Sequence, residues 1–422
     1  MKKFFNPTAS FLVLLPLVMF LQGCLKDTCI NTYKIYTPIY KTLTEVRAEM
    51  GSQAPREIKQ AGKIFLYGSY LFMNEPNKGI HVINNANPAV PIKIGFINIP
   101  GNVDLAVKGN YLFADSYSDI VVFDISNPNA VHPVKFMDNV IKEHGMFWAN
   151  HTVADSVQVI VGYNERDTTV DCSTYSRWQN CANCSFQDAL GNSFSIASGA
   201  AAPSGGRGGS MARFAQTGNF LYGVSETSLY SIDITNPQQP VQTAIKNVGW
   251  GIETIYPFQD KLFIGSNTGM FIFNISNPSN PTAMGEFTHA RSCDPVITDG
   301  QYAYVTLRSG NACFGTSNQM DVIDITNLNN PSLVKTYPFT NPHGLDKDGN
   351  TLFICDGAAG LRVIDASNVQ QLVPIRQISG LNTYDIIAHN GIAIVVASDG
   401  LYQFDYSNTS NIYQVSKINI KN

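Results

Sequence analysis

Polar and charged side chains recur just ahead of apolar runs that lead into Gly, Asn or Asp turns. Aligned on those turns, seven of them fall within about one position of the same place: Lys63, Asp104, Arg213, Glu253, Asp294, His343 and Asp385. The four carboxylates, Asp104, Glu253, Asp294 and Asp385, are weak candidates for Ca²⁺ ligands, because that ion prefers carboxylate oxygens. With two bases and a histidine beside them, the set could instead recognise a polar ligand such as a sugar.

The same residues also fit a role without a ligand. Opposite charges around a channel neutralise one another and keep it hydrated, and we favour this interpretation over ligand binding. His343, in the run Asn341-Pro342-His343-Gly344, has the side chain of a general base, yet a turn histidine more commonly bonds to its neighbours. Catalytic residues therefore stay unassigned.

A repeated motif shows which elements must position these residues. It is written apolar-x-apolar-x-Asp-apolar-Ser/Thr-Asn-Pro, and its copies begin at Gly79, Asp119, Ser228, Gly269, Gln319, Gly360 and Gly400. The successive spacings are 40, 109, 41, 50, 41 and 40 residues. A unit of about 40 residues, with occasional insertions, is therefore repeating.

Each unit has the periodicity of strands. Runs such as "DLAVKGNYLFADS" and "LDKDGNTLFICDG" are two apolar stretches around a hairpin turn, and each is followed by the repeated motif and another apolar stretch. Four short antiparallel strands in about 40 residues make one β-propeller blade. We predict an all-β propeller of seven four-stranded blades, with the seven polar residues at one mouth of its channel.

The repeated aspartates need no catalytic explanation. A residue present in almost every blade serves the blade, and Asp or Asn side chains bond to backbone groups in turns. The residues concerned are Asp124, Asp233, Asp324, Asp365 and Asp405.

The 109-residue spacing holds an insertion at about residues 141–210, which we place in the third blade. Its part "SVQVIVGYNERDTTV" could form a projecting hairpin, and "SGAAAPSGGRGGS" has the composition of a linker that cannot bury a core. An eighth, degenerate blade in this gap is the alternative. Three cysteines lie in this gap: Cys172, Cys181 and Cys184. They could bind zinc with His144 or His151 as the fourth ligand, although a disulfide between two of the cysteines is favoured.

The N-terminus has the pattern of a bacterial lipoprotein signal. Lys2 and Lys3 precede an apolar stretch that ends in Leu21-Gln22-Gly23-Cys24, and this stretch is shorter than a membrane span. We predict removal of residues 1–23, lipidation of Cys24 and attachment to the outer membrane. Lys26-Asp27 resembles a short export signal to the outer face of that membrane. Residues 24–61 would be a tether and lead-in segment, and 62–422 the propeller.

Cysteine usage fits an exported chain. Of the eight cysteines, seven remain after Cys24 is assigned to lipid, so at least one has no partner within the chain. Cys293 and Cys313 flank the predicted hairpin "DPVITDGQYAYVTLRSGNA" and are the preferred disulfide, because both would lie near one rim.

The repeated motif carries a resemblance to a known family. "VVFDISNP", "YSIDITNP", "FIFNISNP" and "DVIDITNL" resemble the LVIVD repeat, over nearly the whole chain from about Gly62 to Ile420. The resemblance implies an exported β-propeller and no established reaction. Departures at Asn84, Asn274, Leu328, Val369 and Thr409 are expected to be harmless to the fold.

Three functions fit these features. The first is a membrane-anchored extracytoplasmic scaffold that binds a protein or polysaccharide partner at the cell envelope. The second is a lactonase-like propeller hydrolase with a metal at the channel mouth, which Lys63 and Arg213 disfavour, and no GxSxG or HExxH motif supports catalysis. The third is a structural component of an envelope complex. The net charge of −4 and the lack of a basic run exclude a nucleic-acid partner.

Overall fold

The computed structural model of the chain describes residues 30–141, 158–171, 197–198, 206–289, 295–309 and 317–421. They belong to two compact units. The smaller unit contains 30–39 and 162–171, and the larger contains the described parts of 40–161 and 190–422. Within these ranges, every helix is too short or too polar to cross a lipid bilayer.

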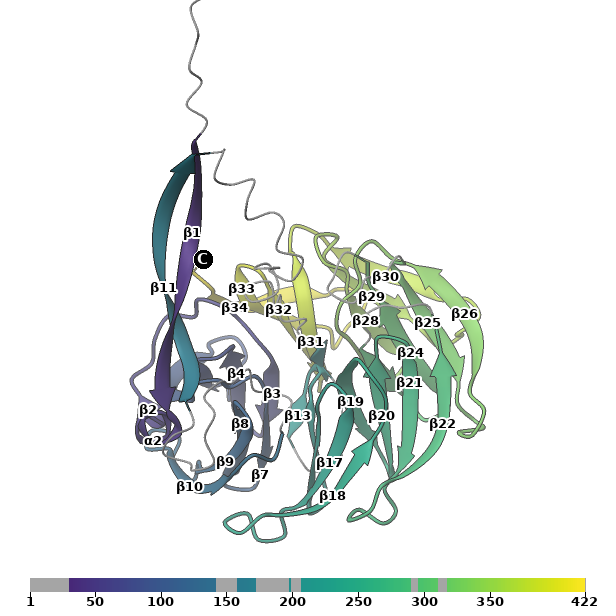
Figure 1. Cartoon of the computed structure of the whole chain (residues 1–422). Helices are drawn as coiled ribbons and strands as arrows, with labels where there is room; N and C mark the ends of the chain where they lie inside the picture. The colour runs from purple at the N-terminus through teal and green to yellow at the C-terminus, as the bar shows by residue number, and fades with distance from the viewer. Residues whose placement is uncertain are drawn as a thin grey trace, which may run out of the picture. The chain divides into compact units, whose positions relative to one another are not determined.

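The larger unit is a β-propeller of seven four-stranded blades, which confirms the fold predicted from the repeats (Figure 1). In each blade the four strands follow one another outwards from the channel and pair antiparallel with their neighbours. Blade 1 contains β3 (Ile64–Tyr67), β4 (Tyr70–Glu75), β5 (Gly79–Asn84) and β6 (Ile92–Asn98); blade 2 contains β7 (Leu105–Lys108), β8 (Tyr111–Ser116), β9 (Asp119–Asp124) and β10 (His132–Met137); blade 3 contains β15 (Phe214–Thr217), β16 (Phe220–Val224), β17 (Ser228–Asp233) and β18 (Val241–Asn247). Blade 4 contains β19 (Ile252–Phe258), β20 (Lys261–Ser266), β21 (Gly269–Asn274) and β22 (Thr282–Thr288); blade 5 contains β23 (Val296–Thr298), β24 (Tyr302–Leu307), β25 (Gln319–Asp324) and β26 (Ser332–Pro338). Blade 6 contains β27 (Leu345–Asp348), β28 (Thr351–Cys355), β29 (Leu361–Asp365) and β30 (Val373–Ile378); blade 7 contains β31 (Thr383–His389), β32 (Ile392–Ala397), β33 (Gly400–Asp405) and β34 (Tyr413–Asn419).

The core lies between blades, so the middle strands are covered on both faces. In β9, Val121, Val122 and Phe123 are all fully buried. They share one apolar cluster with Val82 of blade 1 and Ile232 of blade 3. This packing explains why the repeated motif reads as an almost continuous apolar run rather than an alternating one.

The repeated aspartate stabilises the turn that leads to the outermost strand. The Oδ1 atom of Asp124 accepts a hydrogen bond from the backbone N of Ser126 at 2.8 Å. The same bond is 2.8 Å long at Asp233, Asp324, Asp365 and Asp405, 2.9 Å at Asn274 and 3.0 Å at Asn84. An amide oxygen accepts as a carboxylate oxygen does, so the two Asn departures leave the turn intact.

The same turn also connects neighbouring blades. The carbonyl of Pro88 accepts from Ser416 Oγ of the preceding blade at 2.7 Å, and that of Pro278 accepts from Ser231 Oγ at 2.6 Å. Val369 occupies the proline position in blade 6, and its carbonyl accepts from Tyr337 Oη at 2.7 Å. Any residue supplies this carbonyl, which explains why Val369 can replace proline in the motif.

Blades 7 and 1 close the ring through side chains and a short terminal bridge. The buried amides of Asn85 and Gln403 exchange two hydrogen bonds, of 3.0 and 2.7 Å. Ile58 and Ile420 form a parallel β-bridge beside them. An apolar cluster that includes Leu71 of blade 1 joins the two blades, so closure needs no strand shared between them.

Local contacts attach residues 42–53, which precede the first blade, to the propeller. The short helix α2 (Leu43–Ala48) begins with a capping box formed by Thr42 and Glu45. The strand β2 (Gly51–Gln53) then pairs with the outer edge of β6. Backbone N of Ser52 donates to the carbonyl of Val131 at 3.0 Å, which attaches this strand to blade 2 as well.

One part of the insertion pairs differently from the hairpin expected for it. The strand β11 (Gln158–Asp171) has β1 (Ile30–Thr42) as its partner, so its pairing joins two distant parts of the sequence. In the smaller unit, Lys34 and Glu165 form an ion pair of 2.6 Å, and the rings of Tyr36 and Tyr163 meet edge to face at 6.4 Å. Complementary side chains on the two strands favour this pairing.

Candidate functional site at the channel mouth

The end of the insertion lies against the inner strands of the propeller. We call Gly206–Met211 the channel segment; it contains β13 (Arg207–Gly208) and β14 (Ser210–Met211). β13 pairs antiparallel with β3 (Figure 1). β14 pairs with β12 (Ala197–Ser198) and lies beside β19 and β31. Ser210 Oγ accepts a bond of 2.7 Å from the backbone N of Leu345. For residues 206–210, the described end of "SGAAAPSGGRGGS", the prediction of a linker is therefore wrong, whereas 199–205 lie outside the described residues.

Small residues allow the channel segment to fit. A Cβ atom on Gly206 would overlap the ring of Phe65, and one on Gly209 would overlap the carboxylate of Asp385. Three glycines in the six residues leave only the side chains of Arg207, Ser210 and Met211 to accommodate. The feature that made the segment look like a linker, its glycine content, is what permits its burial.

The Arg207 side chain is anchored by a buried acid of blade 6. Its Nη2 atom lies 2.9 Å from Oδ1 of Asp346, which is almost fully buried. Oδ2 of Asp346 accepts from the backbone N of Ala388 in blade 7 at 2.7 Å. Burial raises the pKa of Asp346, while Arg207 and the backbone donors favour its charged form.

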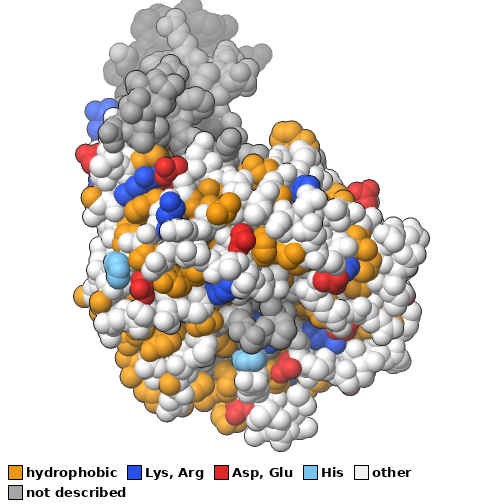
Figure 2. Space-filling model, turned by 90° about the horizontal axis from the view of Figure 1, so that it is seen from below, with side chains coloured by type: hydrophobic (Ala, Val, Ile, Leu, Met, Phe, Trp, Pro, Cys, Tyr) orange, Lys and Arg blue, Asp and Glu red, His pale blue; other side chains and the backbone are white. Residues whose placement is uncertain are grey.

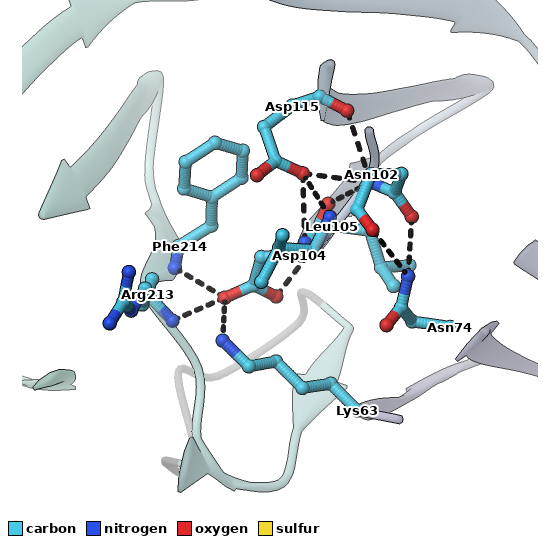
Figure 3. A network of polar contacts seen from close by, with 9 residues as sticks. Lys63, Asn74, Asn102, Asp104, Leu105, Asp115, Arg213 and Phe214 are labelled. Carbon is cyan, nitrogen blue, oxygen red and sulfur yellow. Dashed lines mark hydrogen bonds and ion pairs between the residues drawn. The ribbon is translucent and has the colours of Figure 1, made fainter. Parts of the chain in front are cut away.

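Asp104 bonds to three blades at once (Figure 3). Its Oδ2 atom accepts from Lys63 Nζ of blade 1 at 2.9 Å, and also from the backbone N atoms of Arg213 and Phe214, the latter at 3.0 Å. Its Oδ1 atom accepts from the backbone N of Leu105 at 2.7 Å. With four donors around a carboxylate that is 2% exposed, Asp104 is arranged to hold the blades together rather than to coordinate a metal ion.

A second carboxylate orients the loop that carries Asp104. Oδ1 of Asp115 accepts from the backbone N atoms of Val103 and Asp104, each at 2.8 Å, and from Nδ2 of Asn102 at 2.8 Å. Oδ1 of Asn102 in turn accepts from Nδ2 of Asn74 at 2.6 Å (Figure 3). The network fixes the Asp104 backbone, and the Asp104 side chain bonds to Lys63 from this position.

Glu253 lies among cations at the mouth. Burial raises its pKa to about 7, although Arg213, Arg308 and Lys63 all act to lower it. Glu253, Arg213 and Arg308 are each only partly buried, unlike Lys63 and Asp104. Lys63 and Asp104 thus form a buried ion pair, whereas Glu253 and the two guanidinium groups are partly exposed.

His343 belongs to the same group through Arg308. Its Nδ1 atom lies 2.8 Å from Nη1 of Arg308, and its ring meets that of Tyr384 edge to face at 5.2 Å. Nε2 lies 3.2 Å from Nδ2 of Asn341. Burial, followed by the Arg308 charge, lowers the pKa of His343 to about 3. The neutral ring has a single acceptor nitrogen, which can accept from Arg308 or from Asn341 but not from both.

This burial predicts a loss of stability in mild acid. A folded-state pKa below the ordinary value of 6.5 means that the unfolded chain binds the proton first, so stability falls as the pH drops below about 6.5. From about pH 7 to about pH 5, His343 should account for a decrease of about 2 kcal/mol in the free energy of unfolding. Urea unfolding at several pH values should show a flatter profile for His343→Gln.

The matched control is His132→Gln, because His132 is exposed. It should leave the pH profile unchanged. If His343→Gln also shows the same pH dependence of unfolding as the wild type, His343 is not buried in its neutral form.

The remaining predicted residues are placed as follows. Asp385 is fully buried against the channel segment, and its Oδ1 accepts from the backbone N of Ile386 at 2.6 Å. Asp294, the lipidation residue Cys24 and the proposed Cys293–Cys313 pair lie outside the described residues, as do the cysteines of the insertion. The described residues contain no cluster of three or more His, Cys, Asp or Glu side chains suited to a metal ion.

Three participating residues were missed by sequence reasoning. Arg207 stands in a glycine-rich stretch, Arg308 directly follows the second strand of blade 5, and Asp346 is the second residue of β27. The alignment on hairpin turns could have found Asp346, since it is an acid in an innermost strand. Arg308 had no comparable signal, because only folding brings it to His343.

Comparison with known families agrees with the repeats seen in the structure. The model of the LVIVD repeat matches residues 101–134, 261–289 and 290–338. The chain is an LVIVD-repeat β-propeller. The matched stretches lie in blades 2, 4 and 5, and the other blades of this LVIVD propeller keep the same turn bonds. No curated protein sequence matches the chain.

Several solved structures share the fold of this LVIVD propeller. A Lactobacillus plantarum protein is 13% identical with a TM-score of 0.55, covering 86% of this chain and 97% of its own. The computationally designed Ika8 protein is 9% identical with a TM-score of 0.52. The match covers 87% of this chain and 90% of the designed one. The periplasmic gluconolactonase PpgL of Pseudomonas aeruginosa is 11% identical with a TM-score of 0.50. The match covers 85% of this chain and 96% of PpgL. At such identities the likeness concerns the fold alone.

Proposed function

We propose that the protein is a lipid-anchored binding scaffold of the cell envelope, which holds a protein or glycan partner outside the cytoplasm. The lipoprotein-like pattern that ends at Cys24 supports the anchor, and Lys26-Asp27 supports the outer membrane and its outer face as the location. The seven-bladed ring supports the scaffold role, because it is a rigid disc with extended surfaces.

The arrangement of the channel carries this proposal. The channel segment bonds to blades 1 and 6 from inside, and Asp104 and Asp346 are each used in internal ion pairs and backbone bonds. A propeller hydrolase with a channel metal needs acids that converge on an ion, whereas these two acids bond to Lys63 and Arg207. Binding at a surface or at the mouth therefore fits the molecule better than a reaction inside the channel.

The charge distribution supports a partner other than nucleic acid. On the face shown in Figure 2, Lys and Arg side chains are scattered among acidic and apolar ones rather than gathered. The net charge of −4 agrees with this distribution. Nucleic-acid binding depends on a concentrated basic surface.

The anchor and the partner can be tested together on intact cells. Cys24→Ala should move the full-length protein from the membrane fraction to a soluble one and remove its cross-links to an envelope partner. External protease should degrade the wild-type protein if it lies on the outer face. Retention of Cys24→Ala in the membrane fraction, or a wild-type protein without any envelope cross-link, would contradict the proposal.

A further inference from the structure

The lead-in of the chain shows how a short segment can lie between two blades. Its strand β2 pairs antiparallel with the outer edge of β6 in blade 1, where Gly51 lies opposite Asn98. The backbone N of Ser52 then donates to the carbonyl of Val131, the residue just before β10 of blade 2. One added strand therefore pairs with the outer strand of one blade and bonds to the next blade.

The junction between blades 5 and 6 has the same construction, but within the described residues no strand is added to it. By position in the repeat, Tyr337 and Leu372 correspond to Ile97 and Val131. An open groove of about 380 Å³ lies here, which we call the 5–6 groove. The carbonyl of Leu372 is not bonded to any residue that the structure describes, whereas that of Val131 accepts from Ser52. The residues that line the groove include Tyr337, Phe339, Arg362, Leu372, Ile375 and Gln377.

The outer edge of β26 can accept a partner strand. β26 is the outermost strand of blade 5 (Figure 1). The backbone N of Phe339 donates inward to the carbonyl of Asn318 at 3.0 Å. Because bonding directions alternate along a strand, Thr336 and Pro338 point their backbone groups away from the blade. Pro338 has no N–H, so three groups are left for pairing: the N–H and carbonyl of Thr336 and the carbonyl of Pro338. A short strand like β2 would use all three.

At the junction that the lead-in fills, a cation of the lead-in meets acids of blade 2. The guanidinium group of Arg47 in α2 lies 4.8 Å from the centre of the Phe136 ring. It pairs with Asp119 at 2.5 Å and also with Asp138, which follows β10. The lead-in therefore matches its neighbour in charge as well as in backbone bonding.

Blade 6 presents cations at the corresponding place. Gln377 occupies the position of Phe136, and its Oε1 accepts from Nη1 of Arg362 at 2.7 Å. Nε of Arg362 lies 3.0 Å from the buried Asp356, which fixes the guanidinium group. Arg376 also lines the groove and forms no ion pair with a residue that the structure describes. The described residues that line the 5–6 groove include no Asp or Glu, so its charge complements an acidic segment.

We propose that the 5–6 groove binds a short segment of a partner protein, which adds to β26 as an antiparallel strand and carries an acidic side chain where the lead-in carries Arg47. The inference rests on the binding function proposed above and commits it to one surface and to a protein partner. Added strands derive affinity from backbone bonds and specificity from a few side chains. Here Thr336, Pro338 and the Leu372 carbonyl supply the backbone bonds, and Arg362 contacts the acid.

Fluorescence anisotropy with labelled synthetic peptides and the purified full-length protein tests the groove. The probe has the sequence of residues 42–53 with Arg47→Glu, and its match is the unchanged sequence. The acidic peptide should bind about fivefold more tightly at low salt, because the change turns a repulsion near Arg362 into an attraction. An N-methyl group on the amide of Gln53 should weaken its binding about tenfold, because the bond to Thr336 is lost.

Matched protein variants separate this edge from the others. Thr336→Pro removes an outward N–H, and proline is tolerated in an edge strand. This variant should bind the acidic peptide about tenfold more weakly. Glu286→Pro makes the same change at the same position of blade 4 and should bind the peptide as the wild type does. Gln377→Glu keeps an acceptor for Arg362 and adds a negative charge to the groove, so it should remove the preference for the acidic peptide.

The outcomes separate this inference from the proposed function. Equal binding of the two peptides, no binding of either at millimolar concentration, or unchanged binding in Thr336→Pro would overturn it. So would a dimer of the wild type that Thr336→Pro dissociates, because the groove would then belong to a second copy of the chain. If envelope cross-links persist when the peptides do not bind, the scaffold function stands on another surface. If the acidic peptide binds as expected while no partner is cross-linked, the scaffold function fails and the groove stands. Thermal unfolding of each variant verifies that a loss of binding is not a loss of folding.

Discussion

Replacing Asp104 by Ala is expected to lower the free energy of unfolding by about 4 kcal/mol. The substitution leaves Lys63 buried without its counter-ion and removes the acceptor of three backbone N–H groups, including those of Leu105 and Phe214. Burial already lowers the pKa of Lys63, with Asp104 as the main opposing charge. Without that charge, the buried Lys63 side chain should lose its proton and become a neutral amine, or the first three blades should separate.

Equilibrium unfolding in urea measures the effect. Lys63→Met should lower the free energy of unfolding by only about 2 kcal/mol, because Asp104 keeps its backbone donors. Lys421→Met breaks an exposed ion pair with Glu57 and should change stability by less than about 1 kcal/mol. An Asp104→Ala protein as stable as the wild type, or more stable, would mean that this carboxylate is reserved for a ligand, since binding residues commonly reduce stability.

The propeller was predictable because its signal is repeated. Asp124 alone could have been a catalytic acid, but a copy in nearly every unit indicated a turn, and its bond to Ser126 has that role. Each copy adds independent support, so departures such as Asn274 do not hide the pattern. Fold information of this kind is local and periodic, and sequence reasoning detects it well.

The channel segment could not be predicted for a physical reason. Gly206 and Gly209 pack against Phe65 and Asp385, so these two positions must lack side chains for the segment to be buried. A solvated linker has the same glycine-rich composition. Only the surrounding inner strands distinguish the two cases, and these strands come from blades far apart in the sequence.

The mouth was predictable in part. Alignment on the hairpin turns brought Lys63 and Asp104 to the same level, and the structure joins them at 2.9 Å. It could not tell that Asp104 also accepts from the backbone of Arg213, nor that Arg308 lies beside His343, because these partners are set by the rotation from blade to blade. Position along a strand is readable from the sequence, whereas pairing across the ring is not.

The channel segment should also be required for the stability of the ring. Asp346→Ala removes the acceptor of Arg207 and of the backbone N of Ala388, leaving a mostly buried guanidinium without its counter-ion. We expect a loss of about 4 kcal/mol in the free energy of unfolding, together with release of the segment from the channel. Limited proteolysis should then cut near Arg207, which the wild-type protein protects.

A double variant separates the ion pair from the packing. Arg207→Met with Asp346→Leu replaces two charges by apolar groups of similar size, and such replacements of buried pairs are often neutral or stabilising. It should therefore recover most of the stability lost in Asp346→Ala, whereas Gly209→Val, which would overlap the Asp385 carboxylate, should expel the segment with both charges still in place. If Asp346→Ala unfolds at the same urea concentration as the wild type and Arg207 stays protected from protease, the backbone pairing with β3 and the Ser210–Leu345 bond are sufficient to hold the segment, and the ion pair has no part in closing the channel.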